Sequence, residues 1–324
     1  MSTNAPNVIN LPTRAPAHAT VAVLSDTHYW PAGVEQVGSS GSVQVLAAGD
    51  EILAALAAEL DELQPDAILH LGDVTCGGGT YAMGDGAFED ALRHVQSLLR
   101  ARSAPVFALP GNHDCYPGGS DWSCFEEMWG LSAGQGWTVD TPVARLVLLN
   151  AQGHSAAQIT AARHADDGPA DPVYGWVNEA ELARLDQALA GAGDRPVVVF
   201  VHQLLRPWAG DQEWKDFYEV RNAPAVLDVM ARHGNVRAVI QGHAHRLDVH
   251  TALVGKWQTT FVVVPSLVEY PLAWLRLDMD ATSLRLRLCP LPLPALLDVT
   301  CASGAGQGWR AGRPAWQDMT IALR

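Results

Sequence analysis

The sequence Gly111-Asn112-His113-Asp114 presents an amide, an imidazole and a carboxylate side by side. It follows the apolar run 105–109, and a short run bounded by prolines predicts a buried strand with a tight turn after it. The three side chains differ in what they can donate, accept and ligate. Placed where a strand of an α/β sheet ends, such groups are typical of an active site in the crevice beyond the carboxyl ends of the strands.

Four other apolar runs end in polar residues of the same kinds. The runs 19–25, 67–71, 196–201 and 236–240 lead, in that order, into Asp26-Thr27-His28, Gly72-Asp73, His202 and Gly242-His243-Ala244-His245. In an extended chain, residues i and i+2 point to the same side, so the pair Asp26 and His28 can reach one ion. The pair His243 and His245 has the same spacing.

The donors at these strand ends indicate a particular class of metal site. They comprise two carboxylates, one amide oxygen and four imidazoles, with no cysteine at a matching position: Asp26, Asp73, Asn112, His28, His202, His243 and His245. Mixed oxygen and nitrogen ligation suits Mn, Fe or Zn better than Ca or Mg. Seven ligands are too many for one tetrahedral ion and about right for two divalent ions that share a bridging carboxylate.

The order D-x-H, G-D, G-N-H-D, H and G-H-x-H, spread over residues 20–245, resembles that of the calcineurin-like metallophosphoesterase superfamily. Residues 218–233 and 265–270 are most similar to its bacterial cyclic-nucleotide phosphodiesterases. The resemblance implies an α/β fold, a four-layer αββα sandwich in which helices flank two packed mixed β-sheets. It also implies that one ion is held by Asp26, His28, Asp73 and His245, and the other by Asp73, Asn112, His202 and His243.

The resemblance implies that His113 is catalytic. It would stand beside the scissile phosphate without binding a metal, where it would stabilise the equatorial oxygens or protonate the leaving alkoxide, a role worth about 100- to 10,000-fold in rate. Asp114 is placed to fix the tautomer of a neighbouring histidine. Many relatives carry an acid or amide three residues after the G-D aspartate, and some phosphoprotein phosphatases then add an arginine. Cys76 and Gly77 stand there in this chain, which argues against a protein phosphatase.

The activity that we expect is hydrolysis of a small phosphodiester such as a cyclic nucleotide, by a hydroxide generated between two metal ions about 3.5–4 Å apart. Two other activities use the same ligands. One is a pyrophosphatase for nucleoside-diphosphate alcohols or sugars, and the other is a phosphomonoesterase. A non-catalytic scaffold with this fold would have lost a ligand or the catalytic histidine, and this chain has all of them.

The loops 29–49, 151–172 and 203–222 are expected to select the substrate, because loops on a fixed scaffold carry specificity. Within them, Arg206 and Trp208 are candidates for stacking a base or gripping a phosphate, and His154 is a candidate for approaching the substrate; surface packing or solvation of these side chains is the alternative. Two residues near the motifs have simpler interpretations. His70 is expected to be a satisfied core histidine and Cys76 a small buried filler.

The spacing of apolar residues predicts helices at 50–64, 87–101, 178–190 and 224–233, with Asp50 capping the first, and strands at 274–278 and 283–288. Strands alternate with helices along most of the chain and then follow one another directly. This order favours a layered α/β domain, which we place at 19–289. Residues 1–18 are expected to form a loose tail or an edge segment before it. The Pro/Gly-rich extension 290–324 has two interpretations, packing across the domain or joining a homodimer.

The net charge of −14 argues against a nucleic-acid or anionic-membrane surface, while bound metal ions can still attract an anionic substrate. The five cysteines form no C-x-x-C pair, and residues 1–20 lack the apolar segment of a secretory signal. No apolar run has the length of a membrane span. We therefore expect a cytoplasmic protein with reduced thiols, acting on a small-molecule phosphoester.

Overall fold

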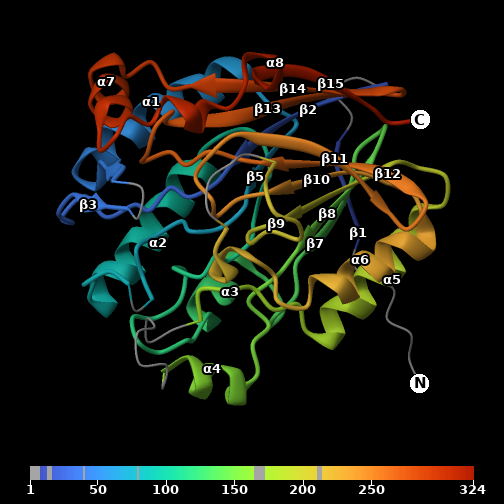
Figure 1. Cartoon of the computed structure of the whole chain (residues 1–324), viewed down its shortest axis with the longest axis horizontal. Coiled ribbons are helices and arrows are strands. Elements are labelled where there is room, and N and C mark those ends of the chain that lie inside the picture. Colours follow the sequence, from blue (N-terminus) through green and yellow to red (C-terminus); the bar gives the residue numbers. More distant parts are fainter. Residues whose placement is uncertain (1–7, 13–16, 39–40, 79, 164–171, 210–213) are drawn as a thin grey trace.

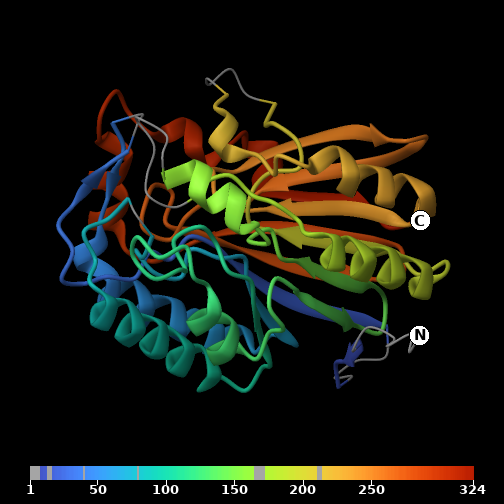
Figure 2. The same ribbon diagram turned by 90° about the horizontal axis from the view of Figure 1, so that it is seen from below.

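The computed structural model describes residues 8–12, 17–38, 41–78, 80–163, 172–209 and 214–324. Two large β-sheets lie face to face, and helices cover the outer face of each sheet (Figures 1 and 2). Both sheets contain parallel and antiparallel strand pairs. The predicted four-layer α/β sandwich is confirmed.

The first sheet has six strands in the order β15-β14-β13-β2-β5-β6. Their bounds are β2 (His18–Leu24), β5 (Ala67–His70), β6 (Val106–Ala108), β13 (Ala273–Asp280), β14 (Ser283–Pro290) and β15 (Asp318–Ala322). Strands β2, β5 and β6 are parallel, so their carboxyl ends lie at one edge of the sheet. Helices α1 (Gly49–Leu63) and α2 (Asp85–Arg100) pack on its outer face.

The second sheet has seven strands in the order β1-β7-β8-β9-β10-β12-β11. Their bounds are β1 (Val8–Asn10), β7 (Trp137–Asp140), β8 (Arg145–Leu149), β9 (Val197–Val201), β10 (Val236–Gln241), β11 (Asp248–Val254) and β12 (Trp257–Val263). Strands β8, β9, β10 and β12 are parallel. Helices α5 (Glu179–Ala192) and α6 (Ala223–His233) cover the outer face of this sheet.

The alternation of side chains along the central strands builds these layers. In β2, Val23 packs in the core between the sheets, while Leu24 packs in the cluster with α1 and α2. In β9, Phe200 packs between the sheets and Val199 packs with α5 and α6. Because both faces of these strands are buried, they appear in the sequence as continuous apolar runs.

The remaining elements are short. They are β3 (Gln36–Val37), β4 (Val43–Gln44), η1 (Leu46–Ala48), α3 (Ser123–Trp129), α4 (Ala156–Arg163), η2 (Asp216–Tyr218), α7 (Pro294–Ala302), η3 (Gly308–Ala311) and α8 (Pro314–Gln317). Helix α4 lies where the sequence predicts a loop. The capping role predicted for Asp50 is wrong, because Asp50 lies inside the first turn of α1 and its carboxylate accepts a hydrogen bond from the Tyr29 hydroxyl at 2.7 Å.

Both ends of the described chain enter the sheets, since β1 pairs with β7 and β15 pairs with β14. The extension 290–324 therefore packs against the domain. Parts of the predicted tail (1–7 and 13–16) and of the three predicted specificity loops (39–40, 164–171 and 210–213) lie outside the described residues. Within the described ranges, no helix combines the length and the apolar character needed to cross a membrane.

Candidate metal centre and its cavity

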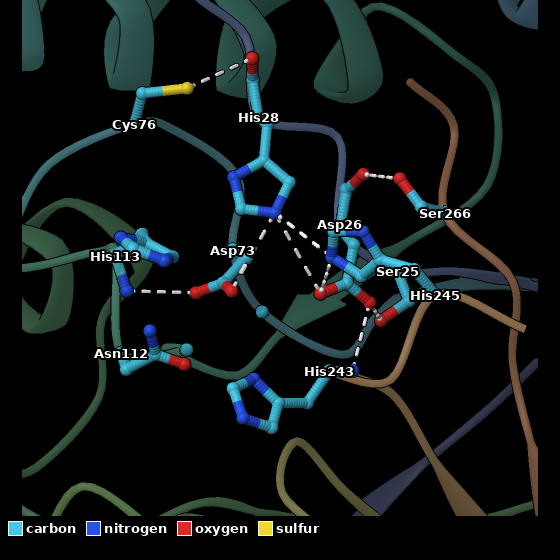
Figure 3. Close-up of polar contacts among 12 residues, drawn as sticks. Ser25, Asp26, His28, Asp73, Cys76, Asn112, His113, His243, His245 and Ser266 are labelled. Carbon is cyan, nitrogen blue, oxygen red and sulfur yellow. Dashed lines mark hydrogen bonds and ion pairs between the residues drawn. The ribbon is translucent and has the colours of Figure 1, made fainter. Parts of the chain in front are cut away.

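The polar strand ends predicted from the sequence meet at one place. Strands β2, β5 and β6 deliver their terminal residues from the first sheet, and β9 and β10 deliver theirs from the second. Figure 3 shows several of these side chains directed toward one another. They form two groups whose donor atoms all lie within 4.8 Å of one another, Asp26 with His28 and His245, and Asp73 with His202 and His243.

In the first group, two imidazoles converge on one carboxylate oxygen. His245 Nε2 lies 3.1 Å from Asp26 Oδ1 and 3.2 Å from His28 Nε2 (Figure 3). His28 Nε2 lies 3.9 Å from the same oxygen. The other oxygen of Asp26 accepts hydrogen bonds from the Ser25 hydroxyl and, at 3.0 Å, from the His243 N–H. The Asp26 carboxylate is thereby held with Oδ1 toward the histidines.

Asp73 stands between the two groups. Its Oδ2 atom lies 3.2 Å from His202 Nε2 and 3.7 Å from His28 Nε2, and these histidines belong to different groups. His202 Nε2 also lies 3.2 Å from Asn112 Oδ1. The His202 and His243 ring centroids are 5.0 Å apart. A carboxylate that bridges two ions requires a position of this kind.

The backbone at these residues has an uncommon conformation. Asp26, His28, Asp73, His243 and His245 all have positive φ, between 42° and 65°. Residues other than glycine rarely adopt this left-handed region, and each such residue costs about 1–3 kcal/mol, so it persists only where its surroundings impose it. Strain of this kind clusters at functional sites, and here it coincides with five of the seven predicted ligands.

Hydrogen-bond partners orient two of the imidazoles. Glu269 Oε2 accepts a hydrogen bond from His245 Nδ1 at 2.8 Å, and the Leu71 carbonyl accepts one from His202 Nδ1 at 3.0 Å. In each ring Nε2 then faces the carboxylates, the orientation that a metal-binding histidine needs. Sequence reasoning missed Glu269, although it follows β12 within the 265–270 segment, as the other polar residues follow their strands.

Asp114 does not take the position predicted for it. Its carboxylate accepts hydrogen bonds from the backbone N–H groups of Gly111, Val74 and Thr75 at 2.9–3.2 Å. It therefore ties together the turns that follow β5 and β6, and Glu269 is the carboxylate that orients a histidine.

The two residues with simple interpretations are buried among hydrogen-bond partners. His70 donates from Nε2 to the Thr27 hydroxyl at 2.6 Å and accepts at Nδ1 from the Gly72 N–H. Burial lowers the pKa of His70 to about 4, so this core histidine is neutral. The Cys76 thiol is buried and donates to the His28 carbonyl.

Electrostatics at the site favour a bound cation. Burial alone would raise the pKa of Asp26, but His245 outweighs it and lowers this pKa below the ordinary value. The pKa of Asp73 is likewise well below its ordinary value, with His202 as the main force opposing burial. Burial lowers the pKa of His28 and of His243 to about 3. Two ionised carboxylates thus stand among imidazoles that include neutral ones, which are the protonation states that metal binding requires.

A cavity of about 600 Å³ opens beside the two groups. Its wall includes His113, whose ring centroid is 5.3 Å from that of His28. The aromatic and cationic residues on the wall are Tyr81, Tyr174, Phe217, Tyr218, Arg221 and Arg310.

The three predicted substrate contacts are not among the cavity-lining residues in the described part of the chain. Arg206 donates to a backbone carbonyl of β11, and the Trp208 ring lies 4.2 Å from the guanidinium of Arg246. His154 donates from Nε2 to the Tyr174 carbonyl at 2.8 Å, behind the cavity wall. These positions favour packing roles for all three, and Arg221 is an exposed arginine that lines the cavity.

Comparison with known proteins identifies the family. Residues 19–247 match the sequence profile of the calcineurin-like phosphoesterases. The chain belongs to the calcineurin-like phosphoesterase family. The superfamily resemblance seen in the order of the motifs is thereby confirmed.

Curated relatives are similar to this chain at low sequence identity. A 3',5'-cyclic adenosine monophosphate phosphodiesterase, CpdA, of Haemophilus influenzae is 25% identical over 184 residues, which are 56% of this chain and 55% of the relative. A probable cyclic nucleotide phosphodiesterase of a Pseudoalteromonas species is 25% identical over 58% of this chain and 59% of its own length. The glycerophosphodiester phosphodiesterase GpdQ of Enterobacter lignolyticus is 24% identical over 77% of each chain. The chain thus spans little more than half the length of the first two relatives.

Solved structures share the fold. A dimetal phosphatase from Danio rerio superimposes with a TM-score of 0.68 at 17% identity, over 94% of this chain and 99% of that one. The structure of PhoD gives a TM-score of 0.52 at 10% identity, over 84% of this chain and 65% of that one.

The residues of this family member fit two divalent ions. Within the described residues, the ion pairs of the buried Asp26 and Asp73 carboxylates are formed with histidines alone. Buried carboxylates need a compensating charge, and closely spaced Nε2 atoms such as those of His28 and His245 are suitable ligands for a shared cation. The donor set therefore fits a dinuclear centre of divalent metal ions.

Proposed function

We propose that the chain is a metal-dependent phosphodiesterase that hydrolyses a small phosphodiester, with cyclic nucleotides as the substrate class. One observation carries the proposal: two groups of ligands, linked by Asp73, adjoin a cavity of about 600 Å³ that has His113 on its wall. The activities of the relatives support a diester, since CpdA is named a cyclic AMP phosphodiesterase and GpdQ a glycerophosphodiester phosphodiesterase.

Two divalent ions, of Mn, Fe or Zn, are part of this proposal. One ion would be held by Asp26, His28, His245 and Asp73, and the other by His202, His243, Asn112 and Asp73. When bound, the ions would activate water for attack and neutralise the charge of the phosphoryl group.

His113 is the residue that we assign to proton transfer. Its Nδ1 donates to the Gly77 carbonyl at 2.9 Å, so Nε2 is the ring nitrogen available to a substrate. Its backbone N–H donates to Asp73 Oδ1 at 2.8 Å, which ties its position to that of the ligands (Figure 3). When protonated, His113 would give the Nε2 proton to the leaving alkoxide as the ester P–O bond breaks.

The cavity wall supports a nucleotide as the substrate. The Arg221 guanidinium lies 3.5 Å from the centroid of the Tyr174 ring, a stacked arrangement that keeps the cation in place. The Tyr81 ring lies 4.8 Å from that of His113. Flat aromatic surfaces suit a base, and an arginine suits phosphate oxygens.

The test compares four substrates with the Mn-loaded protein: cyclic AMP, bis-p-nitrophenyl phosphate, ADP-ribose and p-nitrophenyl phosphate. We expect the two diesters to have the highest kcat/KM, because this ratio ranks substrates by transition-state binding. A higher value for ADP-ribose would instead indicate a pyrophosphatase, and a higher value for p-nitrophenyl phosphate a phosphomonoesterase. Metal-loaded protein that hydrolyses none of them would contradict the proposed substrate class and favour the scaffold interpretation.

A further inference from the structure

A buried ion pair between Glu269 and Arg310 joins the C-terminal segment to the candidate metal centre. Arg310 lies in η3, beyond the residues 19–247 that match the family. Its Nη1 atom lies 3.0 Å from Glu269 Oε2 and 2.7 Å from the carbonyl oxygen of His245. A single guanidinium therefore contacts both the backbone of a candidate ligand and the carboxylate that orients the imidazole of that ligand.

The contacts among these residues form a closed network. Glu269 Oε2 accepts from His245 Nδ1 at 2.8 Å, and Glu269 Oε1 accepts from the Ser42 hydroxyl at 2.8 Å. The Ser42 oxygen accepts in turn from Arg310 Nη2 at 3.0 Å. Glu269 is 2% exposed and Arg310 is 7% exposed. Removing either partner of such a buried ion pair would leave an uncompensated charge in the interior. Glu269 and Arg310 therefore hold each other in position.

The C-terminal segment is seated to make this contact. Arg310 Nε donates to Gln307 Oε1 at 2.9 Å, and the Leu247 N–H donates to the Arg310 carbonyl at 2.7 Å. Gly41 and Gly304 allow the chain segments to approach closely, because a Cβ on Gly304 would lie 2.7 Å from the Gly41 carbonyl oxygen. The position of Arg310 is thus fixed from several sides.

We propose that Glu269 and Arg310 are positioning residues that set the affinity of the ion held by Asp26, His28 and His245. The inference rests on the proposed function, in that it takes metal ions to bind there. Glu269 holds the His245 ring with Nε2 toward Asp26. Arg310 fixes Glu269 and restrains the His245 backbone, which has a φ of 50°. Because the network contacts His245, the effect falls on one of the two ions.

The experiment measures Mn²⁺ binding to the full chain by isothermal titration calorimetry. The variants are Glu269→Gln and Arg310→Gln, with Arg313→Gln as the matched control, because Arg313 is an exposed residue of the same segment that stacks on Trp316. We expect the wild type to bind two ions. In the first two variants, one ion should bind about 10- to 100-fold more weakly while the other is nearly unchanged, since partners of metal-binding histidines contribute this much to affinity.

Each other outcome has a distinct meaning. Wild-type affinities for both ions in Arg310→Gln would overturn the positioning role and leave the metal centre standing. A wild type that does not bind two ions would overturn the proposed function as well. If the melting curve of metal-free Arg310→Gln shows that it does not fold, Ser42→Ala provides the test, because it removes only the hydroxyl between Glu269 and Arg310. It should weaken the same ion, and unchanged binding would overturn the inference.

Discussion

The Asp73 carboxylate meets His202 across the junction of the two sheets, with Oδ2 3.2 Å from Nε2. Asp73 follows β5 of the six-stranded sheet, and His202 follows β9 of the seven-stranded sheet. The site is therefore built jointly by both sheets, and it forms only when they pack face to face. This relationship makes Asp73 the residue on which both ligand groups depend.

Replacing Asp73 with asparagine should release both ions, because its carboxylate faces ligands of both groups. Asp26→Asn is the matched variant, since the ion pairs of Asp26 lie within one group. Metal analysis after desalting from Mn²⁺ should give well under one ion per chain for Asp73→Asn and about one for Asp26→Asn. Retention of two ions by Asp73→Asn would rule out a bridging carboxylate.

His113→Ala should lower kcat on cyclic AMP by about 100- to 10,000-fold, because the departing ribose alkoxide would lose its proton donor. The variant should retain the metal content of the wild type, since His113 is in neither ligand group. His154→Gln is a suitable control, because this histidine is held behind the cavity wall by the Tyr174 carbonyl. A rate for His113→Ala close to that of the wild type would remove the proposed acid.

The fold and the convergence of the candidate ligands could be predicted because these residues lie just beyond the ends of buried strands. An apolar run that ends in Asp26 or His202 predicts a strand and also places that polar side chain at the end of the strand. The same local pattern therefore predicts the strand and the candidate ligand. The parallel arrangement of the central strands then brings those ends to one edge. Helices α1, α2, α5 and α6 could be placed for the same reason, since they alternate with these strands along the chain, whereas α4 lies in a predicted loop.

The cavity wall could not be predicted, because its contacts depend on how distant segments pack. Arg206 and Arg221 lie in the same predicted loop, and only the path of the backbone turns one toward β11 and the other toward Tyr174. Arg310 gave no signal either, since the sequence around it has no periodicity that links it to Glu269. Asp114 and Glu269 show the same limit, because composition alone does not tell which carboxylate reaches a histidine.

The metal-free protein should be most stable near pH 6.5. Burial lowers the pKa of His245, but Asp26 and Glu269 outweigh it and raise this pKa to about 10 from the ordinary value of 6.5. The folded state thus keeps a proton that the unfolded chain loses above pH 6.5, and stability falls as the pH rises toward 10. His28 and His243 act in the opposite sense, because burial lowers each pKa to about 3 and unfolding takes up protons below pH 6.5.

Urea unfolding of the metal-free protein, kept in chelator at about pH 5, 6.5 and 9, measures this dependence. The midpoint should be highest at the middle pH. Saturating Mn²⁺ should raise the midpoint most at the highest pH, because the deprotonated imidazoles are the metal ligands. A metal-free midpoint that rises steadily up to pH 9 would contradict the assignment of the retained proton to His245.

Arg221→Ala should raise the KM for cyclic AMP, because Arg221 is an exposed cation on the cavity wall and the substrate is an anion. Hydrogen bonds to charged groups contribute about 1.5–3 kcal/mol, which corresponds to an increase of about 10- to 100-fold. Arg206→Ala is the control from the same loop, because its guanidinium donates to a β11 carbonyl. Equal KM values for the two variants would exclude Arg221 as a substrate contact.

Gly111→Ala should damage the site through backbone contact alone. A Cβ at this position would lie 2.2 Å from Asp73 Oδ1 and 2.4 Å from Asp73 N, and the second contact is to backbone that cannot rotate away. We expect a loss of about 1–3 kcal/mol in the free energy of unfolding, as for other overpacked positions, together with weaker Mn²⁺ binding. Gly86→Ala in α2 has nothing within 4 Å of its added methyl and should stabilise the protein slightly through helix propensity. Urea unfolding and Mn²⁺ titration of both variants check the pair, and wild-type metal affinity in Gly111→Ala would mean that the turn after β6 does not fix the position of Asp73.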